Sequence, residues 1–304
     1  MLDFSVFKNK HIKCAGLGEV LFDVYPSGAK IGGAPANFAF HCKQTGLDAL
    51  VVSSVGNDEL GFSARNILAS KFLPALLVEN SKITGAVNVT LNSQGVPTYV
   101  FLEDTAYDNL PFTDLLKETA QKLQMVCFGS LAQRSMVTHE TIMKFLDAMP
   151  ENLRLRVFDV NLRRQYYSEN VINESLKRTE IFKCNEDELP LLCKIAGIDT
   201  PSPAAYRDYL RAKGIFCFIF TEGAKQSTVF LNDEISIVPT KKVDVVDTVG
   251  AGDSFTATLV SLLMQGKDLA FAHQKAVEVS AFVCTQQGAM PELPEDLVKS
   301  LNLN

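Results

Sequence analysis

The feature that most constrains the fold is an alternation, from residue 111 onward, of short apolar runs with longer amphipathic segments. Mostly continuous apolar runs are typical of strands buried on both faces, and the longer segments repeat apolar residues at helical spacing. We expect strands at 125–128, 155–160, 181–184, 216–221, 228–231 and 235–238, and helices at 112–122, 136–149, 203–213 and 268–286. This alternation predicts an α/β fold whose mostly parallel sheet is covered by helices on both faces.

The first third of the chain has a different pattern. A β segment at 12–24, broken by Gly16 and Gly18, leads to a helix that begins after Gly32-Gly33, and a strand at 50–55 leads to a helix at 62–71. Between 82 and 102, Thr, Val and Tyr alternate with small and polar residues around a Ser93-Gln94-Gly95 turn, which predicts an antiparallel hairpin. We interpret the segments near 19–31 and 82–104 as a small antiparallel β-lid on a single domain spanning 1–304.

Composition excludes several classes of protein. The 304 residues carry a net charge of −6 with no basic stripe, which argues against a nucleic-acid partner. No apolar run approaches the length of a membrane span, and the first ten residues lack the apolar core of a signal peptide. The seven cysteines are scattered, often within apolar runs, and therefore indicate reduced core residues rather than disulfides or zinc ligands. We expect a soluble cytoplasmic protein.

A glycine-rich turn, Asp247-Thr248-Val249-Gly250-Ala251-Gly252-Asp253, follows a β-like run at 241–246 and opens a helix. Such a junction directs unpaired backbone N–H groups and the positive end of the helix dipole at one point, which favours an anion there. Asp253 places a carboxylate in the same place. That arrangement suits a base that accepts a proton from a substrate hydroxyl while the amides hold a charged group in transfer. The alternative is that Asp253 only caps the helix.

Polar residues follow four successive apolar segments, at the edge where ligands of parallel sheets bind. They are Asp159, Asn161 and Arg163, then Asn185 and Glu188, then Thr221 and Gly223, and finally 247–253. A second loop-to-helix junction carries Asn37, whose amide can both donate and accept hydrogen bonds, four residues after Gly33. The same junction, taken alone, is also consistent with a turn and a capping Asn.

Three of these motifs together resemble the signatures of the ribokinase-like (PfkB) carbohydrate kinases. They are Gly32-Gly33-Ala34-Pro35-Ala36-Asn37, Asn185-Glu186-Asp187-Glu188 and the turn at 247–253, in the family's order along nearly the full chain. The resemblance implies a three-layer ribokinase-like fold and an ATP-dependent sugar kinase.

The resemblance also implies roles for single residues. Asp253 would be the base, and the amides of Gly250, Ala251 and Gly252 would hold the transferring phosphoryl group. The sugar would contact Asp23, Gly33 and Asn37, and ATP would be bordered by Asn185, Thr221, Gly223 and Gly288. Glu188 would organise Mg²⁺ through water, and Asp247 and Val249 would lie at a K⁺ site that the family often has. Arg163 would bind the sugar or the phosphates, or form a structural ion pair.

Within the family, the GGAPAN motif and the segment Asp159-Val160-Asn161-Leu162-Arg163 resemble fructokinases, so fructose is the expected substrate. Kinases for 2-keto-3-deoxygluconate, ribose, tagatose phosphate or a nucleoside are alternatives, because sugar choice depends on pocket contacts. The family's T-L-G-x-x-G is altered here to Thr221-Glu222-Gly223-Ala224-Lys225-Gln226. Similar kinases often dimerise through the lid, which makes a homodimer the expected assembly.

Two other classes of function remain open from the residues. A nucleotide-binding dehydrogenase would use a glycine turn, but Gly16-Leu17-Gly18-Glu19 lacks the third glycine of that fingerprint. A catalytically inactive sugar-binding regulator could keep the fold, but it would gain from losing Asp253, which repels phosphate.

Overall fold

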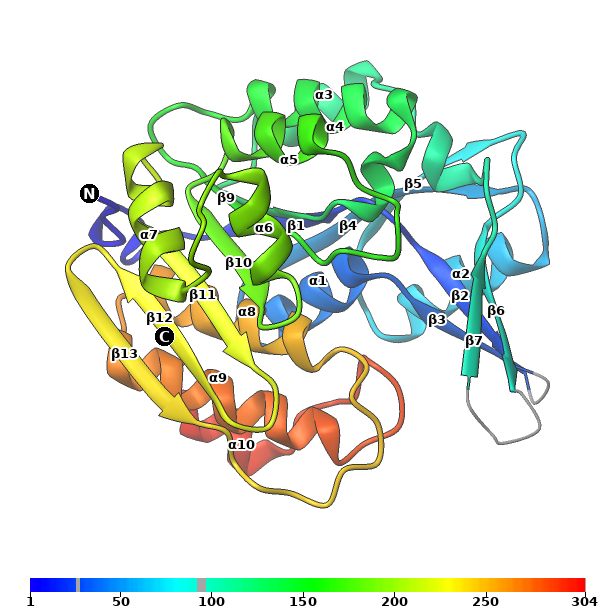
Figure 1. Ribbon diagram of the computed structural model, residues 1–304. Helices are drawn as coiled ribbons and strands as arrows, with labels where there is room; N and C mark the ends of the chain where they lie inside the picture. The colour runs from blue at the N-terminus through cyan, green and yellow to red at the C-terminus, as the bar shows by residue number, and fades with distance from the viewer. Residues whose placement is uncertain (26–27, 92–96, 304) are drawn as a thin grey trace.

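The computed structural model describes residues 1–25, 28–91 and 97–303, arranged as two sheets of unequal size with helices on both faces of the larger one (Figure 1). The predicted turn at Ser93-Gln94-Gly95 lies outside the described residues. The main sheet has the strand order β13 (Glu234–Pro239), β12 (Gln226–Leu231), β11 (Cys217–Glu222), β10 (Ile181–Asn185), β9 (Leu155–Asp159), β8 (Met125–Phe128), β1 (Lys13–Leu17), β4 (Asp48–Gly56) and β5 (Ala75–Asn80). The small sheet has the order β3 (Gly28–Gly32), β2 (Leu21–Tyr25), β6 (Gly85–Leu91) and β7 (Pro97–Phe101).

The main sheet is parallel from β5 to β11, and β12 is antiparallel to both of its neighbours. From β1 the chain builds outward first through β4 and β5 and later, on the other side, through β8 to β13. The strand order therefore reverses at β1, and the carboxyl ends of β1, β8, β9 and β10 border the crevice where ligands of such sheets bind.

Two hydrophobic cores lie on opposite faces of the main sheet. One contains α1 (Ala34–Gln44), α2 (Glu59–Ser70), α8 (Ala251–Met264) and α9 (Leu269–Cys284), with α10 (Glu295–Ser300) packed against it. The other contains α3 (Asp114–Ala120), α4 (Met136–Ala148), α5 (Glu169–Leu176), α6 (Leu189–Ile195) and α7 (Pro203–Ala212). Short 3₁₀ turns lie at Ser5–Phe7, Ala106–Asn109 and Leu131–Arg134. The expected three-layer α/β fold is confirmed.

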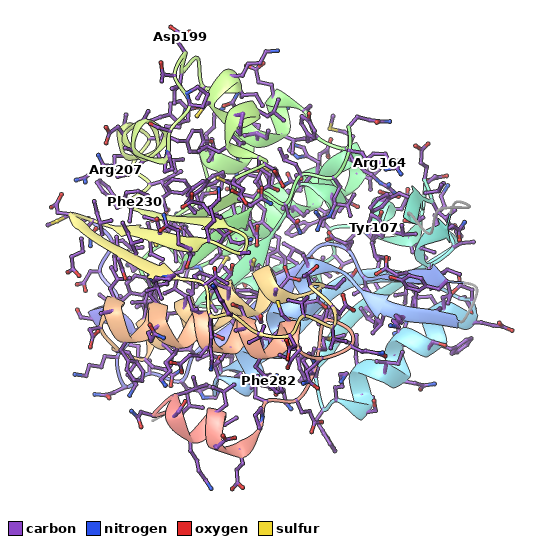
Figure 2. The ribbon with its side chains drawn as sticks, turned by 60° about the horizontal axis from the view of Figure 1, so that its bottom comes forward. Tyr107, Arg164, Asp199, Arg207, Phe230 and Phe282 are labelled. Atoms are coloured by element: carbon purple, nitrogen blue, oxygen red, sulfur yellow. The ribbon has the colours of Figure 1, made fainter. Side chains whose placement is uncertain are left out.

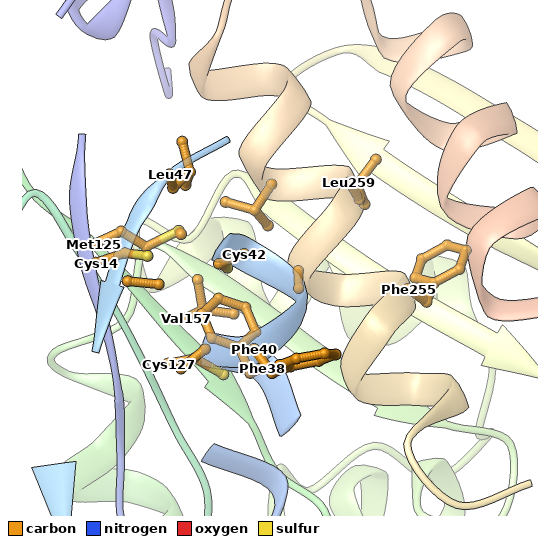
Figure 3. Close-up of a cluster of buried hydrophobic side chains, with 14 of the residues drawn as sticks. Cys14, Phe38, Phe40, Cys42, Leu47, Met125, Cys127, Val157, Phe255 and Leu259 are labelled. Carbon is orange, nitrogen blue, oxygen red and sulfur yellow. The ribbon is translucent and has the colours of Figure 1, made fainter. Parts of the chain in front are cut away.

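Helices α1 and α8 form the centre of the first core. Phe38, Phe40 and Cys42 of α1 pack between Leu259 of α8 and the strand residues Cys14, Met125 and Val157 (Figure 3). Because α8 is buried along most of its length, its apolar residues surround the whole helix rather than forming one stripe. Its first turn is consequently fixed against the sheet by the packing of every later turn.

The small sheet departs from the expected antiparallel arrangement in one pair. Strands β2 and β6 run parallel, whereas β3 with β2 and β6 with β7 are antiparallel. The reason is that β2 and β6 follow β1 and β5, which are parallel strands of the main sheet and end at the same edge. Both therefore leave that edge in the same direction.

Two expectations about single segments need correction. The β segment at 12–24, expected to be broken at both Gly16 and Gly18, is broken only at Gly18, whose φ is +147°, and forms two strands in different sheets, β1 and β2. The β-like run at 241–246 forms no strand, because Val245 and Val246 are 61% and 58% exposed and β13 already ends the sheet. In the segment 221–226, Glu222 and Gln226 are the two residues that differ from the family's T-L-G-x-x-G pattern. The Gln226 side chain donates a hydrogen bond to the Glu222 carboxylate, so these two residues bond to each other.

All seven cysteines, which lie within the described ranges, are unpaired, and six are buried. This confirms their expected role as core residues. Among residues 1–25, 28–91 and 97–303, every helix is too short or too polar to cross a membrane.

One polar cluster joins the small sheet to the rest of the molecule. Asp58 caps α2 by accepting a hydrogen bond from Gly61 N at 2.7 Å, and its other oxygen accepts one from Thr84 N at 2.7 Å, just before β6. The Thr84 hydroxyl donates to Asp58 at 2.7 Å and accepts from Gly56 N at 3.0 Å. One carboxylate thus fixes both a helix start and the entry to the small sheet.

Replacing Asp58 with Ala is expected to lower the free energy of unfolding by about 2–4 kcal/mol, because a helix cap and a second set of hydrogen bonds are lost together. Urea denaturation measures the change. Ser202→Ala is the matched control, since Ser202 caps α7 through Ala205 N alone and its loss should cost about 1 kcal/mol. Equal destabilisation of the two variants would contradict the linking role of Asp58.

Candidate active site

The site is built around the first turn of α8. Gly250 is the N-cap residue with φ of +81°, and a Cβ at this position would lie 2.7 Å from Ala289 atoms. Only glycine satisfies both the backbone conformation and the space. Among the described residues, no side chain caps this turn. Ala251 N donates to Thr248 O at 3.3 Å, and the amides of Gly252 and Asp253 retain the anion-binding character of a helix N-terminus.

Asp253 lies at the third helical position and does not cap the helix. Its Oδ2 accepts a hydrogen bond of 2.7 Å from Nδ2 of Asn37, which α1 supplies from a point 216 residues earlier in the chain. Burial and the nearby Asp159 carboxylate raise the pKa of Asp253 to about 6, against the opposing effects of Asn37, Lys183 and Arg163. A carboxylate in this range is still mostly ionised at neutral pH and is a stronger base than an ordinary Asp.

A buried ion pair lies beneath this turn and was not predicted. Lys183 of β10 donates to Asp159 of β9 at 2.7 Å, and its Nζ would lie 3.2 Å from a Cβ at Gly252. Burial opposes its charge, but the carboxylates of Asp159 and Glu188 raise the pKa of Lys183 above its usual value. The signal in the sequence was a lysine inside the otherwise apolar strand Ile181–Asn185. Lys183 therefore brings a fixed positive charge close to the anion-binding amides.

Glu188 and Asn185 form a compact turn beyond β10. The two oxygens of Glu188 accept hydrogen bonds from Leu162 N at 2.7 Å and from Asn185 N at 2.8 Å, and Asn185 Oδ1 accepts from Glu188 N at 3.0 Å. Burial raises the pKa of Glu188 despite the neighbouring Lys183. The buried Oδ1 of Asp159 has no hydrogen-bond partner within the described part of the chain. Oxygen donors of this kind fit Mg²⁺, which usually keeps several of its waters.

The residues expected to contact the sugar lie on the other side of Asp253. Asn37 is 3% exposed, and its Oδ1 finds no partner among the residues described. Asp23 lies on β2 opposite Lys30 of β3, and burial raises the pKa of its carboxyl. Arg163, on the loop after β9, lowers the pKa of both Asp23 and Asp253 through its charge. Gly33 has φ of +113° and lets the start of α1 approach Glu19 closely.

The residues expected to border the nucleotide lie along the carboxyl ends of β10 and β11 and in the loop before α10. Thr221 ends the parallel part of the sheet, and Gly223 has φ of +47° and accepts a hydrogen bond from the Thr240 hydroxyl. Gly288 N donates to Asp247 Oδ2 at 3.1 Å, while Val249 N donates to Asp247 Oδ1 at 3.1 Å. The Asp247 side chain thus joins the α8 turn to the 284–290 loop. Within residues 1–25, 28–91 and 97–303, no group of three or more His, Cys, Asp or Glu side chains could hold a metal directly.

Glu19 is a second site residue that was not predicted. It follows β1 at the point where the strand order reverses, is 3% exposed, and interacts electrostatically with Arg163 and Asp253. Burial raises its pKa to about 7. Its position directly after Gly18, at the end of an apolar run, was the available signal.

The geometry brings the expected residues into one site with two sides. Asn37 of α1 bonds to Asp253, and the charge of Arg163 acts on both Asp253 and Asp23, whereas Lys183 of β10 lies close to Gly252 and interacts with Glu188. Between them lie a carboxylate and a set of amides suited to an anion. This arrangement can hold an uncharged hydroxyl compound and a phosphorylated compound on either side of one base.

Comparison with known proteins agrees with this geometry. Residues 27–296 match the model of the PfkB family carbohydrate kinases. The uncharacterized sugar kinase PH1459 from Pyrococcus horikoshii is 29% identical over 88% of this chain and 84% of its own. Its structure in complex with ATP superposes with a TM-score of 0.78 and 26% identity, covering 95% of this chain and 99% of that one.

Two further relatives have more specific names. An ATP-dependent 6-phosphofructokinase from Thermoanaerobacterium thermosaccharolyticum is 27% identical over 98% of this chain and 96% of its own. A fructokinase from Klebsiella pneumoniae is 28% identical over 94% of this chain and 98% of its own. Since the family model spans most of the chain, the protein belongs to the PfkB family of carbohydrate kinases.

Proposed function

We propose that this protein transfers the γ-phosphoryl group of ATP to a primary hydroxyl of a small sugar, with fructose as the first substrate to test. The observation that carries the proposal is Asp253, a carboxylate of raised pKa held at 2.7 Å by Asn37 in the first turn of α8. A protein that only bound phosphate at this turn would be weakened by this acid, because the two negative charges repel each other. We therefore favour an active kinase over a non-catalytic regulator.

In the proposed reaction, the sugar hydroxyl donates its proton to Asp253 as its oxygen bonds to the γ-phosphorus. The bond from that phosphorus to the bridging oxygen breaks, and ADP leaves with the electron pair. We propose that the amides of Gly250, Ala251 and Gly252 hold the group in transfer, with the positive charge of Lys183 close to Gly252. Positioning and charge neutralisation carry most of the rate in such reactions, so a weak base is sufficient.

The choice of fructose rests on the sequence motifs and on the name of one relative. GGAPAN at 32–37 and the Asp159–Arg163 segment resemble fructokinases, and a K. pneumoniae relative bears that name. We propose that Asp23, Gly33, Asn37 and Arg163 contact the sugar. The unpartnered, buried Oδ1 of Asn37 supports this, because a substrate hydroxyl would supply the donor it lacks among the described residues.

On the nucleotide side, we propose that Asn185, Thr221, Gly223 and Gly288 border ATP and that Glu188 holds Mg²⁺ through water. Bound Mg²⁺ would neutralise charge on the β- and γ-phosphates. The orphaned Oδ1 of Asp159 and the Glu188 carboxylate provide the oxygen-rich surroundings that a hydrated Mg²⁺ needs. Asp247 and Val249 are proposed for K⁺, whose effect a comparison of initial rates with and without KCl would reveal.

We further propose that the small sheet acts as a lid over the sugar and that its exposed edge mediates a homodimer. Water competes with the sugar for the phosphoryl group, so a cover over the site is useful. The edge strand β3 has exposed residues from Gly28 to Lys30, and among the described strands only β2 pairs with it, which leaves its other side to a second copy. The unpaired cysteines support a reducing compartment such as the cytoplasm.

Replacing Asp253 with Asn is expected to lower kcat for fructose by at least about a thousandfold while sugar and ATP still bind, because the base is lost but the amides remain. ADP release gives the rate, and isothermal titration gives the affinities. Asp268→Asn is the matched control, since Asp268 caps α9 and lies outside the site. Turnover of the Asp253 variant at the wild-type rate would rule out this mechanism.

The pH dependence of the wild-type enzyme provides a second test. Asp253 must be ionised to act as a base, and its pKa is about 6. We therefore expect kcat/KM for the sugar to be level above pH 7 and to fall about tenfold per unit below pH 6. An acid limb centred near pH 4, the value of an ordinary Asp, would contradict the buried environment described for this base.

A further inference from the structure

We propose that Arg134 is a positioning residue for the sugar, whose guanidinium fixes the loop that carries Arg163 against the end of β7 in the small sheet. This role rests on the proposed function and deepens it, because Arg163 is proposed to contact the sugar and the small sheet to cover it. None of the motifs that identify the site includes Arg134. One buried side chain makes all the contacts that this role requires.

The first of these contacts is a buried ion pair. Arg134 ends the 3₁₀ turn Leu131–Arg134, which follows β8, and its side chain is 8% exposed. Its Nε and Nη2 atoms donate to the two oxygens of Asp108 at 2.7 Å each. Oδ2 of Asp108 also accepts hydrogen bonds of 2.9 Å from the backbone N–H and the hydroxyl of Thr105. This bidentate pair fixes the plane of the guanidinium.

The same guanidinium holds the chain at the end of β7. Nη2 of Arg134 also donates to the carbonyl oxygen of Leu102, the residue directly after β7. Leu102 N in turn donates to Ala86 O of β6 at 2.9 Å, so Leu102 is bonded to the small sheet as well. Arg134 therefore connects the turn after β8 to the end of the small sheet.

Two tyrosine rings lie against the guanidinium. Cζ of Arg134 lies 5.0 Å from the ring centroid of Tyr107 and 4.8 Å from that of Tyr166. The Tyr166 ring also meets Phe101 of β7 edge-on, with the ring centroids 5.6 Å apart. Figure 2 labels Tyr107, on the side of the molecule that carries the small sheet, and Arg164, in the same loop as Tyr166. Tyr166 thus contacts both the guanidinium and the small sheet.

Tyr166 in turn fixes the part of the loop that presents Arg163. The Tyr166 N–H donates to the Arg163 carbonyl at 2.9 Å, which closes a tight turn on the loop after β9. Within this turn Arg164 has a φ of +49°, a backbone conformation that residues other than glycine rarely adopt. Arg163 and Arg164 are exposed, so the position of the turn depends on the packing of Tyr166. A shift of the Tyr166 ring would therefore move Arg163.

Stability alone does not account for this use of an arginine. A buried ion pair contributes little net stability compared with apolar side chains of similar volume. The buried Nη1 of Arg134 finds no hydrogen-bond partner in the part of the chain that the structure describes, and an unpaired donor of this kind lowers stability further. The guanidinium instead supplies direction, because its planar fork binds one carboxylate, one carbonyl and two ring faces at once.

Arg134→Lys separates positioning from charge, since lysine keeps the positive charge beside Asp108 but loses the planar fork and the ring stacking. KM for the sugar should rise about tenfold while KM for ATP stays within about twofold of wild type, because only the sugar loop is displaced. An unchanged KM for the sugar in a folded Arg134→Lys variant would overturn the proposal.

Arg178→Lys is the matched control. Arg178 forms a similar bidentate pair with Asp147, at 2.7 and 2.8 Å. This pair lies at the ends of α4 and α5, where the chain leads into β9 and β10, and not at the carboxyl ends of these strands, which border the site. Both KM values should therefore equal those of wild type. A rise in KM for the sugar as large as that of Arg134→Lys would show a general effect of losing an arginine and overturn the proposal.

A double-mutant cycle tests whether the effect passes through Arg163. In an Arg163→Ala background, adding Arg134→Lys should raise KM for the sugar by less than about twofold, because the group that Arg134 positions is already absent. Full and independent effects of the two substitutions would overturn the positioning route. Wild-type KM in Arg163→Ala alone would overturn it as well, since Arg163 would then have no contact with the sugar.

Hydrogen exchange tests the same contacts without any substrate. In Arg134→Lys, the amides at 101–108 and 162–168 should exchange at least about tenfold faster than in wild type, whereas those of α8 should keep their rates. Unchanged exchange at 162–168, or faster exchange throughout the core, would overturn the positioning role. Absence of wild-type turnover on every sugar would defeat the proposed kinase function, whereas this exchange pattern would still report on Arg134.

Discussion

The hydrogen bond of 2.7 Å between Asn37 and Asp253 joins the first turns of two helices that lie 216 residues apart in the chain. It forms only because α1 and α8 pack against the same face of the main sheet and against each other, with Phe38 and Leu259 in one core (Figure 3). The loop behind the α8 turn is fixed by the same helix, since His41 Nε2 lies 2.9 Å from Ala289 O. The packing of α1 against α8 therefore fixes the positions of Asp253, of the amides in the first turn of α8 and of the loop that contains Ala289.

The charges beneath this bond explain why the site is stable although it buries several ionisable groups. Asp159 and Lys183 form a buried pair at 2.7 Å, so the sheet presents a compensated charge rather than an isolated one. The remaining acids, Asp253, Glu19, Asp23 and Glu188, all have raised pKa values because burial disfavours their charged forms. The protein gives up stability at these positions and gains a base whose strength is matched to neutral pH.

Much of the fold and the anion-binding turn could be predicted from the sequence, because both depend on local patterns. Strand β8 was predicted at its observed bounds, and Gly250 marks a turn whose φ of +81° favours glycine. Contacts distant in sequence could not be predicted in this way. Lys183 and Glu19 belong to the site through burial against residues that are far away in the chain, and the strand expected at 241–246 lacked a neighbour to pair with. The preference of single residues for helix or strand shows neither burial against distant residues nor the presence of a neighbouring strand.

The central claim is that this site phosphorylates a sugar hydroxyl with Asp253 as the base. The most direct measurement is ADP release from Mg-ATP by the wild-type protein with fructose, ribose, 2-keto-3-deoxygluconate, fructose 6-phosphate and adenosine at equal concentration. The account predicts rapid, sugar-dependent release that is strongest with fructose and yields a sugar phosphate in equal amount. Release that is independent of every substrate in the panel, or absent while ATP binds, would contradict it.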